Sequence, residues 1–230
     1  MIPFLGPAEP FPPVERALDE PDGLLAAGAD LTPRRLLDAY RHGIFPWFNE
    51  GDPILWWSPD PRIVLVPGEF HVSHSLRKRL KKRDFTVTID AAFAAVLDEC
   101  AAPRLDDGGT WLTPQMKSAY LALHRQGFAH SIEVWMDGAL AGGIYGVAVG
   151  RMFFGESMFS RRTDGSKIAM AYLAAQLGRW AFPLIDCQLE TEHLLSLGAT
   201  AMPRRRFVAE VARLILEPPP RWTLDPDLLV

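Results

Sequence analysis

Two polar residues that could perform acid–base chemistry lie within one short apolar segment. Asp186 and Gln188 stand two positions apart in PLIDCQ (183–188), which is predicted to be a buried strand. Residues i and i+2 of a strand project from one face, so both side chains lie together and Ile185 and Cys187 lie opposite. A carboxylate and an amide at a strand end can accept and orient an amine nucleophile. An Asp in this position can equally cap the helix that follows.

Glu156 is the third candidate. It lies in the aromatic stretch RMFFGESMFS (151–160), which is predicted to form a strand. A carboxylate in such surroundings is paired, bound to a metal or functional. The alternative is an edge-strand Glu that faces water. Cys187 is a poor candidate nucleophile, because the neighbouring Asp186 would raise the pKa of the thiol and no His lies at a recognisable spacing.

Apolar residues next to these polar ones predict a pocket. Most residues of this kind are simply core. A cavity of Met and Phe beside Glu156 and Asp186 would suit an unbranched or aromatic side chain better than a β-branched one, because Met adapts its shape. The apolar set comprises Met152, Phe153, Phe154, Met158 and Phe159, with Ile144 and Ile185 in other predicted strands.

Positive charge is concentrated in residues 71–83, which contain six basic residues and no acid. Removing these six charges takes the net charge of the chain from −4 to −10. On a helix, one side of this segment can meet a polyanion such as a phosphate backbone while Leu76 and Leu80 pack inward. The alternative is a solvated charged face. The six residues are Arg77, Lys78, Arg79, Lys81, Lys82 and Arg83.

The elements that must position these residues fall into two parts. Eleven of the 20 prolines lie in residues 1–62, which are predicted to form a small α/β unit with a helix between Thr32 and Gly43. Strand and helix patterns alternate through residues 63–230, and Asp137-Gly138 predicts a hairpin turn. We therefore expect an α+β protein, with a small N-terminal domain (1–62) and a larger domain (63–230) built on a mixed sheet.

Composition bounds the class of protein. The 230 residues are 48% hydrophobic and 23% charged, which predicts a folded chain of one large domain or one plus a small appendage. Its two cysteines lie far apart and outside any metal-ligand spacing, so we expect no metal site and a reducing compartment. The first residues do not resemble a signal peptide, and no apolar run is long enough to span a bilayer. These features predict a cytoplasmic protein without a membrane segment.

Seven segments, in order along the chain, carry a family resemblance. They are HGIFPWF, DPILWWSPDPR, GTWLTP, AHSIEVW, GGIYGVAVG, GESMFSR and LIDCQ. Over residues 11–215 the chain closely resembles the bacterial leucyl/phenylalanyl-tRNA–protein transferases. The resemblance implies transfer of Leu or Phe, and less readily Met, from aminoacyl-tRNA to an N-terminal Arg or Lys of a protein, creating a degradation signal. It also implies a catalytic domain of the GCN5-related N-acyltransferase type. An aminoacyl ester is already activated, so we expect no cofactor besides the aminoacyl-tRNA co-substrate. Nothing in the sequence demands more than a monomer.

The resemblance also assigns residues to roles. Trp47 and Trp111 would contact the 3′-terminal adenosine of the tRNA, and the basic segment would contact its backbone. Phe153, Met158 and Ile185 would form the pocket for the Leu or Phe side chain. In this pocket Ile144 replaces a residue that is commonly Met in the family. Glu156, Asp186 and Gln188 would form the polar site.

A chemical hypothesis follows from these roles. Asp186 and Gln188 orient the acceptor amine and help relay its proton, while the tRNA ribose hydroxyl accepts a proton on leaving. Glu156 holds either the amino group of the substrate or the cationic end of the acceptor.

Two other classes compete with the transferase. An acyl-CoA-dependent N-acetyltransferase would share the fold, but residues 162–167 only partly match the loop pattern that binds its pyrophosphate. A non-catalytic RNA-binding protein would use the basic segment and exposed Trp. It is disfavoured by the polar residues that cluster at strand ends beside an apolar pocket.

Overall fold

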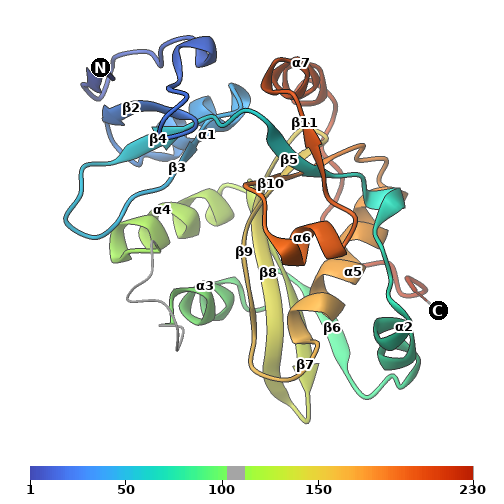
Figure 1. Cartoon of the computed structure of the whole chain (residues 1–230). Coiled ribbons are helices and arrows are strands. Elements are labelled where there is room, and N and C mark those ends of the chain that lie inside the picture. Colours follow the sequence, from blue (N-terminus) through green and yellow to red (C-terminus); the bar gives the residue numbers. More distant parts are fainter. Residues whose placement is uncertain (103–111, 230) are drawn as a thin grey trace.

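The computed structural model describes residues 1–102 and 112–229, and within these it contains two sheets (Figure 1). The smaller sheet belongs to the N-terminal part, and its strand order is β1-β2-β4-β3. Its strands are β1 (Phe4–Leu5), β2 (Leu24–Gly28), β3 (Phe45–Pro46) and β4 (Leu55–Trp57). Two short 3₁₀ helices, Val14–Arg16 and Pro67–Glu69, lie in the connections.

Helix α1 (Pro33–Arg41) lies beside the small sheet and forms where the sequence predicts it. The Thr32 hydroxyl accepts a hydrogen bond from the Arg35 amide, and Pro33 occupies the first turn, where no amide hydrogen is needed. Gly43 follows the helix with a φ of 72°, a conformation that glycine adopts without strain. A short segment joins the end of α1 to β3, and Trp47 follows β3 directly. The position of α1 therefore helps to place Trp47.

The larger sheet is mixed and has the strand order β11-β5-β10-β9-β8-β7-β6. Strands β9 and β10 are parallel, and their other neighbours in the sheet are antiparallel. The predicted α+β class with a mixed sheet is confirmed. The strands are β5 (Arg62–Leu65), β6 (Thr86–Ile89), β7 (Ala129–Met136), β8 (Ala139–Val149), β9 (Met152–Ser160), β10 (Ile185–Gln188) and β11 (Thr200–Met202).

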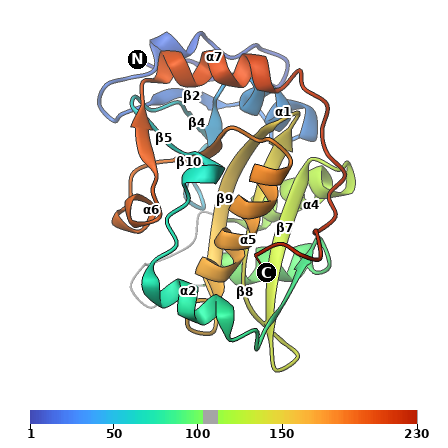
Figure 2. The ribbon, with the colours of Figure 1, turned by 90° about the vertical axis from the view of Figure 1, so that its right-hand side faces the viewer.

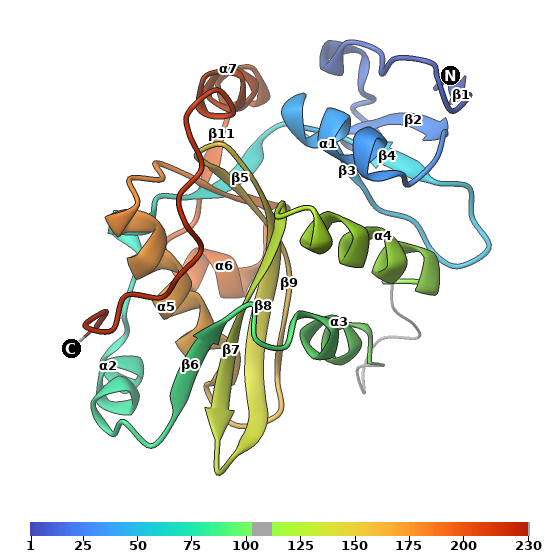
Figure 3. The same cartoon turned by 180° about the vertical axis from the view of Figure 1, so that it is seen from behind.

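Helices cover both faces of this sheet (Figures 2 and 3). Helices α3 (Phe93–Ala101) and α4 (Pro114–Arg125) lie on one face, together with α1 of the N-terminal part. Helix α5 (Gly165–Arg179) packs on the other face, where α2 (His74–Lys81) contacts it. Helix α6 (Glu192–Ser196) precedes β11 in the sequence, and helix α7 (Arg204–Leu214) follows it. We refer below to the α4 side and the α5 side of the sheet.

Most predicted elements form, with differences at their ends. The Asp137-Gly138 turn joins β7 to β8, as predicted. Helix α3 begins at Phe93, and the carboxylate of Asp90 before it accepts a hydrogen bond from the Ser131 amide. Within the described residues, no helix is long and apolar enough to cross a membrane. The expected boundary after residue 62 stays a prediction.

Candidate active site

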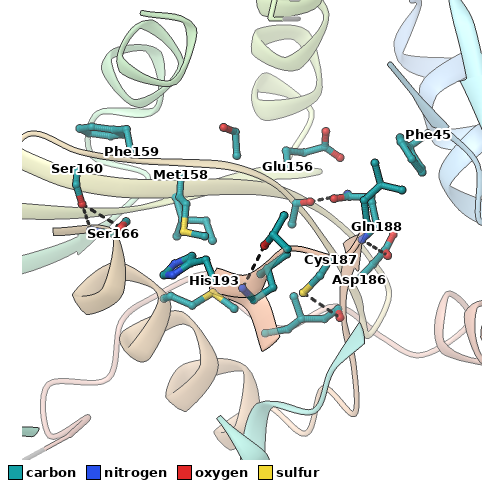
Figure 4. Close-up of a pocket in the computed structure, with 18 of the residues that line it drawn as sticks. Phe45, Glu156, Met158, Phe159, Ser160, Ser166, Asp186, Cys187, Gln188 and His193 are labelled. Atoms are coloured by element: carbon teal, nitrogen blue, oxygen red, sulfur yellow. Dashed lines mark hydrogen bonds between the residues drawn. The ribbon is translucent and has the colours of Figure 1, made fainter. Parts of the chain in front are cut away.

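A pocket of about 1060 Å³ opens where β9 and β10 separate (Figure 4). The two parallel strands pair at Phe153 with Ile185 and at Phe154 with Asp186, and no further pair follows. Beyond this last pair β9 and β10 are no longer hydrogen-bonded to each other as strands. The pocket lies between the residues of β9 and β10 that come after it. Its wall therefore includes residues from both sides of the sheet.

The α5 side of the pocket is apolar. Ile144 and Met158 face each other across the β8–β9 pair, and Ile185 joins them from β10. Ile144 and Ile185 belong to the hydrophobic cluster that packs under α5, and Met158 packs against it. Met170, His193 and Leu194 extend the wall at this side. Of the predicted apolar set, Ile144, Met158, Phe159 and Ile185 line the pocket. Met152, Phe153 and Phe154 are buried in the core and do not line it.

A bulge in β9 turns Glu156 to the α4 side. Tyr145 pairs with Ser157 and Gly146 pairs with Gly155, so Glu156 is the extra residue of β9. A bulge of this kind re-aims a side chain and occurs often beside active sites. The Glu156 side chain consequently lies on the opposite side of the strand from Met158 (Figure 4).

Two tyrosines hold the Glu156 carboxylate. The hydroxyl of Tyr40 in α1 donates to Oε1 at 2.7 Å, and the hydroxyl of Tyr120 in α4 donates to Oε2 at 2.5 Å. Burial raises the pKa of Glu156 to about 7, against the opposing effect of the two hydroxyl donors. The nearby charge of Asp186 raises this pKa further, and that of Arg62 lowers it.

Asp186 is bound by a buried arginine. Nε and Nη2 of Arg62 donate to the two carboxylate oxygens of Asp186, both at 2.7 Å, and neither side chain is more than 1% exposed. The guanidinium also donates to the Gly43 carbonyl and lies between the rings of Phe45 and Phe207, 4.7 Å from each centroid. Asp186 is thus fixed in place with its charge paired.

Gln188 lines the pocket beside Asp186. Its backbone is left-handed, with a φ of 56°, and its amide N–H donates to Oδ1 of Asp186 at 3.0 Å. Its side-chain Nε2 donates to the Gly155 carbonyl at 2.5 Å. A carbonyl oxygen accepts only, so this contact assigns nitrogen to that position and leaves Oε1 outside the contact. Asp186 and Gln188 are in contact, but through the backbone of Gln188 and not as neighbouring side chains of one regular strand face, because the register of β10 shifts between them.

Trp47 stands at the rim of the pocket on the α4 side. Its indole is 44% exposed, and its backbone oxygen accepts from Nε1 of Trp57, whose ring packs edge-on at 5.6 Å. Phe45 lines the pocket beside it. Trp111 lies outside the described residues. An exposed indole held by a second indole is a suitable surface for stacking a nucleic-acid base.

The basic segment lies on α2 and the turn after it. Arg79 is engaged within the protein, because it pairs with Asp84 and lies over the Phe85 ring. Arg77, Lys78, Lys81, Lys82 and Arg83 are exposed. The chain leading into α2 is joined to the end of α6 by the His71 amide, which donates to the Leu197 carbonyl. The exposed charges therefore sit on an element attached next to the α6 wall of the pocket.

Several site residues have no recognisable signal in the sequence. Arg62 reads as a strand residue after SPDP, and Tyr40 and Tyr120 read as apolar positions of helices far from Glu156. His193 lines the pocket, and burial together with the charge of Lys167 lowers its pKa, so its ring is neutral at pH 7. Arg62, Tyr40, Tyr120 and His193 are recognised as site residues only once the fold brings distant parts of the chain together.

Other chemistry finds little support in the described residues. They contain no group of three or more His, Cys, Asp or Glu side chains placed to hold a metal ion. Burial and the charge of Asp186 raise the pKa of Cys187 well above its usual range, so its thiol stays protonated, as expected.

Comparison with known proteins identifies the family. A model of the leucyl/phenylalanyl-tRNA protein transferase matches residues 64–212, and a model of the N-terminal domain of that protein matches residues 29–60. The chain belongs to the leucyl/phenylalanyl-tRNA protein transferase family. The predicted family and the predicted class of enzyme, a transferase, are confirmed.

Relatives cover almost the whole chain. The leucyl/phenylalanyl-tRNA--protein transferase of Aromatoleum aromaticum is 57% identical over 227 residues, which are 98% of this chain and 96% of that protein. That of Azoarcus sp. is 58% identical over 225 residues, 97% and 96% of the two chains. That of Nitrosomonas europaea is 59% identical over 214 residues, 93% and 91% of the two chains.

Solved structures resemble this chain more distantly than these relatives do. A GCN5-related N-acetyltransferase from Kribbella flavida is 14% identical with a TM-score of 0.37, over 73% of this chain and 60% of that one. The L-PGS structure from Bacillus licheniformis is 11% identical with a TM-score of 0.39, over 69% and 51%.

Proposed function

We propose that the chain transfers an aminoacyl group from tRNA to proteins, and specifically Leu or Phe, and less readily Met, to an N-terminal Arg or Lys. The product then serves as a degradation signal. Family membership supports the aminoacyl transfer, and one structural observation supports the finer statement. The pocket joins an apolar cavity on the α5 side to a polar wall with an exposed indole on the α4 side. An aminoacyl-adenosine has the same order of apolar, polar and aromatic parts.

The apolar cavity fits the transferred side chain. Ile144, Met158 and Ile185 offer no hydrogen-bonding group, and neutral His193 adds no charge. A wall containing Met adapts to the straight stem of Leu or the flat ring of Phe. The adenine would stack on Trp47, and the tRNA backbone would follow the exposed charges of α2.

Gln188 is the residue that best fits the acceptor amine. The α-amine of a peptide has an ordinary pKa of about 8 and must lose a proton and face the ester carbonyl. The Oε1 atom of Gln188 accepts one N–H of this amine and so directs the nitrogen lone pair. Asp186 acts through Gln188 as a positioning residue, because its oxygens are bound by Arg62 and by the Gln188 amide.

The remaining expectations follow from the same chemistry. An aminoacyl ester is already activated, so the transfer as proposed needs no cofactor and no covalent enzyme intermediate. We propose a monomer in the cytoplasm that meets two substrates, Leu-tRNA or Phe-tRNA and a protein that begins with Arg or Lys.

One assay separates this function from its competitors. The protein is incubated with Leu-tRNA and a peptide beginning with Arg, and in parallel with acetyl-CoA and the same peptide. Leucyl-peptide from the first mixture alone supports the proposal. Transfer from acetyl-CoA alone would identify an N-acetyltransferase, and tight tRNA binding without product would identify an RNA-binding protein.

A further inference from the structure

Tyr40, Tyr120 and Glu156 form a closed triangle of short contacts. The two hydroxyl–carboxylate distances are 2.7 and 2.5 Å, and the two hydroxyl oxygens are 3.0 Å apart. Both tyrosine side chains are buried. The triangle joins α1 of the N-terminal part, α4 and the bulge of β9 at the pocket wall.

The number of protons in this triangle can change by one without moving its heavy atoms. When Glu156 is ionised, the two hydroxyl protons both point to the carboxylate, and the contact between Tyr40 and Tyr120 holds no proton. When Glu156 is protonated, three protons are shared among three contacts, and each contact becomes one hydrogen bond in a ring. Burial raises the pKa of both tyrosines well above the usual range, so neither hydroxyl loses its proton near neutral pH.

The transfer reaction releases one proton. The acceptor ammonium carries three protons, of which the product amide keeps one and the 3′-oxygen of the tRNA takes one. The third must leave the reacting groups. Three acidic side chains line the pocket in the described part of the chain: Glu99 is paired with Arg161, Asp186 is paired with Arg62, and Glu156 contacts only neutral hydroxyls. Glu156 is therefore the carboxylate whose charge has no contacting cation.

We propose, building on the function proposed above, that Glu156 takes up the released proton and that Tyr40 and Tyr120 are positioning residues that hold and share it. An N–H bond of the acceptor ammonium breaks as an O–H bond forms on Glu156. The freed lone pair attacks the ester carbonyl carbon, the C–N bond forms, and the C–O bond to the tRNA breaks. The departing 3′-oxygen takes a second proton from the nitrogen, and Glu156 returns its proton to solvent after product release.

The surroundings of Glu156 bring the pKa of its carboxyl close to that of the acceptor amine. Burial raises its pKa to about 7, just below the ordinary value of about 8 for the acceptor amine, so proton transfer between them is nearly balanced. The titratable or charged groups that face Glu156 come from five elements. They are Tyr40 of α1, Tyr120 of α4, Tyr145 of β8, Asp186 of β10 and Arg62 of β5.

The test is the pH profile of kcat/KM for leucyl transfer to an Arg-peptide. The native profile should rise with a midpoint near pH 7 and become level above about pH 8, where the acceptor enters already deprotonated and needs no base. Glu156→Gln should lower the rate at pH 7 by about tenfold, because only about a tenth of the acceptor amine is deprotonated there, and its profile should rise with a midpoint near pH 8. Tyr40→Phe and Tyr120→Phe should each move the native midpoint upward by about half to one pH unit, because each hydroxyl stabilises the ionised carboxylate.

The matched control is Tyr145→Phe. The Tyr145 hydroxyl is buried and has no hydrogen-bond partner among the described residues, and its ring packs 5.3 Å from that of Tyr120. This variant removes a hydroxyl from the same cluster and should leave the midpoint unchanged. A merely structural role for Tyr40 and Tyr120 would instead lower the rate equally at every pH.

A second readout does not depend on activity. The infrared carboxyl band that disappears in Glu156→Gln should titrate near pH 7 in the native protein and at higher pH in the two tyrosine variants. A protein that transfers leucine but whose midpoints stay fixed in these variants overturns the role of the triangle alone. A native protein that transfers no leucine overturns the proposed function itself.

Discussion

Arg62 and Asp186 form a fully buried ion pair in which two nitrogens meet two oxygens at 2.7 Å. The pair lies between β5 and β10, and the rings of Phe45 and Phe207 cover the guanidinium. Asp186 in turn holds the backbone of Gln188, so the ion pair determines where the proposed amine-binding oxygen lies. A side chain at the start of β5 thus shapes the end of β10 that lines the pocket.

Removing one member of this pair should cost much more stability than removing both. Arg62→Met should lower the free energy of unfolding by about 3–5 kcal/mol, because the Asp186 charge remains buried without a partner. The double variant Arg62→Met/Asp186→Leu should recover most of that loss, since the remaining groups are apolar. Urea unfolding of the three proteins measures this, and a double variant as unstable as the single one would contradict it.

The same double variant separates positioning from folding. It should bind Leu-tRNA nearly as the native protein does, while turnover falls by about 100-fold, because Gln188 loses the oxygen that holds its amide. Asp186→Ala should likewise lower turnover far more than tRNA affinity. Equal losses of turnover and affinity would remove Asp186 from this role.

The width of the apolar cavity should set the preference between Leu and Phe. Ile144→Ala widens the cavity and should raise the ratio of kcat/KM for Phe-tRNA over Leu-tRNA by about tenfold. Ile132→Ala is the control, because Ile132 is the cross-strand neighbour of Ile144, is equally buried and does not line the pocket. A similar change in both variants would place the selectivity elsewhere.

The exposed charges of α2 should contribute to tRNA affinity without distinguishing between tRNAs. Changing Lys81 and Lys82 to Ala should weaken binding of Leu-tRNA and Phe-tRNA alike and reduce the salt slope by about one for each charge. Arg205 and Arg206, on α7 at the opposite end of the molecule, provide the control pair (Figure 2). Titration of fluorescent tRNA at several salt concentrations measures both, and equal effects of the two pairs would contradict a site on α2.

Glu156 should make the fold less stable as the pH rises. Its pKa is raised from 4.5 to about 7 in the folded chain, so its favourable contribution is present below pH 4.5 and is lost as the pH rises through 7. Glu156→Gln should abolish this change, which amounts to about 3 kcal/mol between pH 4.5 and 8. Unfolding free energies at the two pH values test it, and a native protein that loses no more stability than the variant would refute the shift.

Local sequence patterns anticipated much of the frame and part of the site. Strand alternation and turn residues predicted the strands that carry Asp186, Gln188 and Ile185, and the family resemblance assigned Ile144, Met158 and Ile185 to the side-chain pocket. The bulge at Glu156 was not predictable in this way, since simple alternation puts it on the same face as Met158.

Long-range pairing accounts for the rest. Tyr40 reaches Glu156 across 116 residues, and Arg62 reaches Asp186 across 124. Nothing in the neighbourhood of either residue signals its partner. Only the packing of the N-terminal part against the large sheet brings these groups together, so local sequence pattern cannot predict their contacts.

The most direct test of the proposed transfer is the mass of an acceptor peptide after incubation with the protein and Leu-tRNA. A peptide with a free N-terminal Arg should gain one leucine, and fragmentation should place that leucine on its α-amine. The same peptide with an acetylated N-terminus should gain none. Addition of leucine to the blocked peptide, or to neither peptide, would contradict the proposed function.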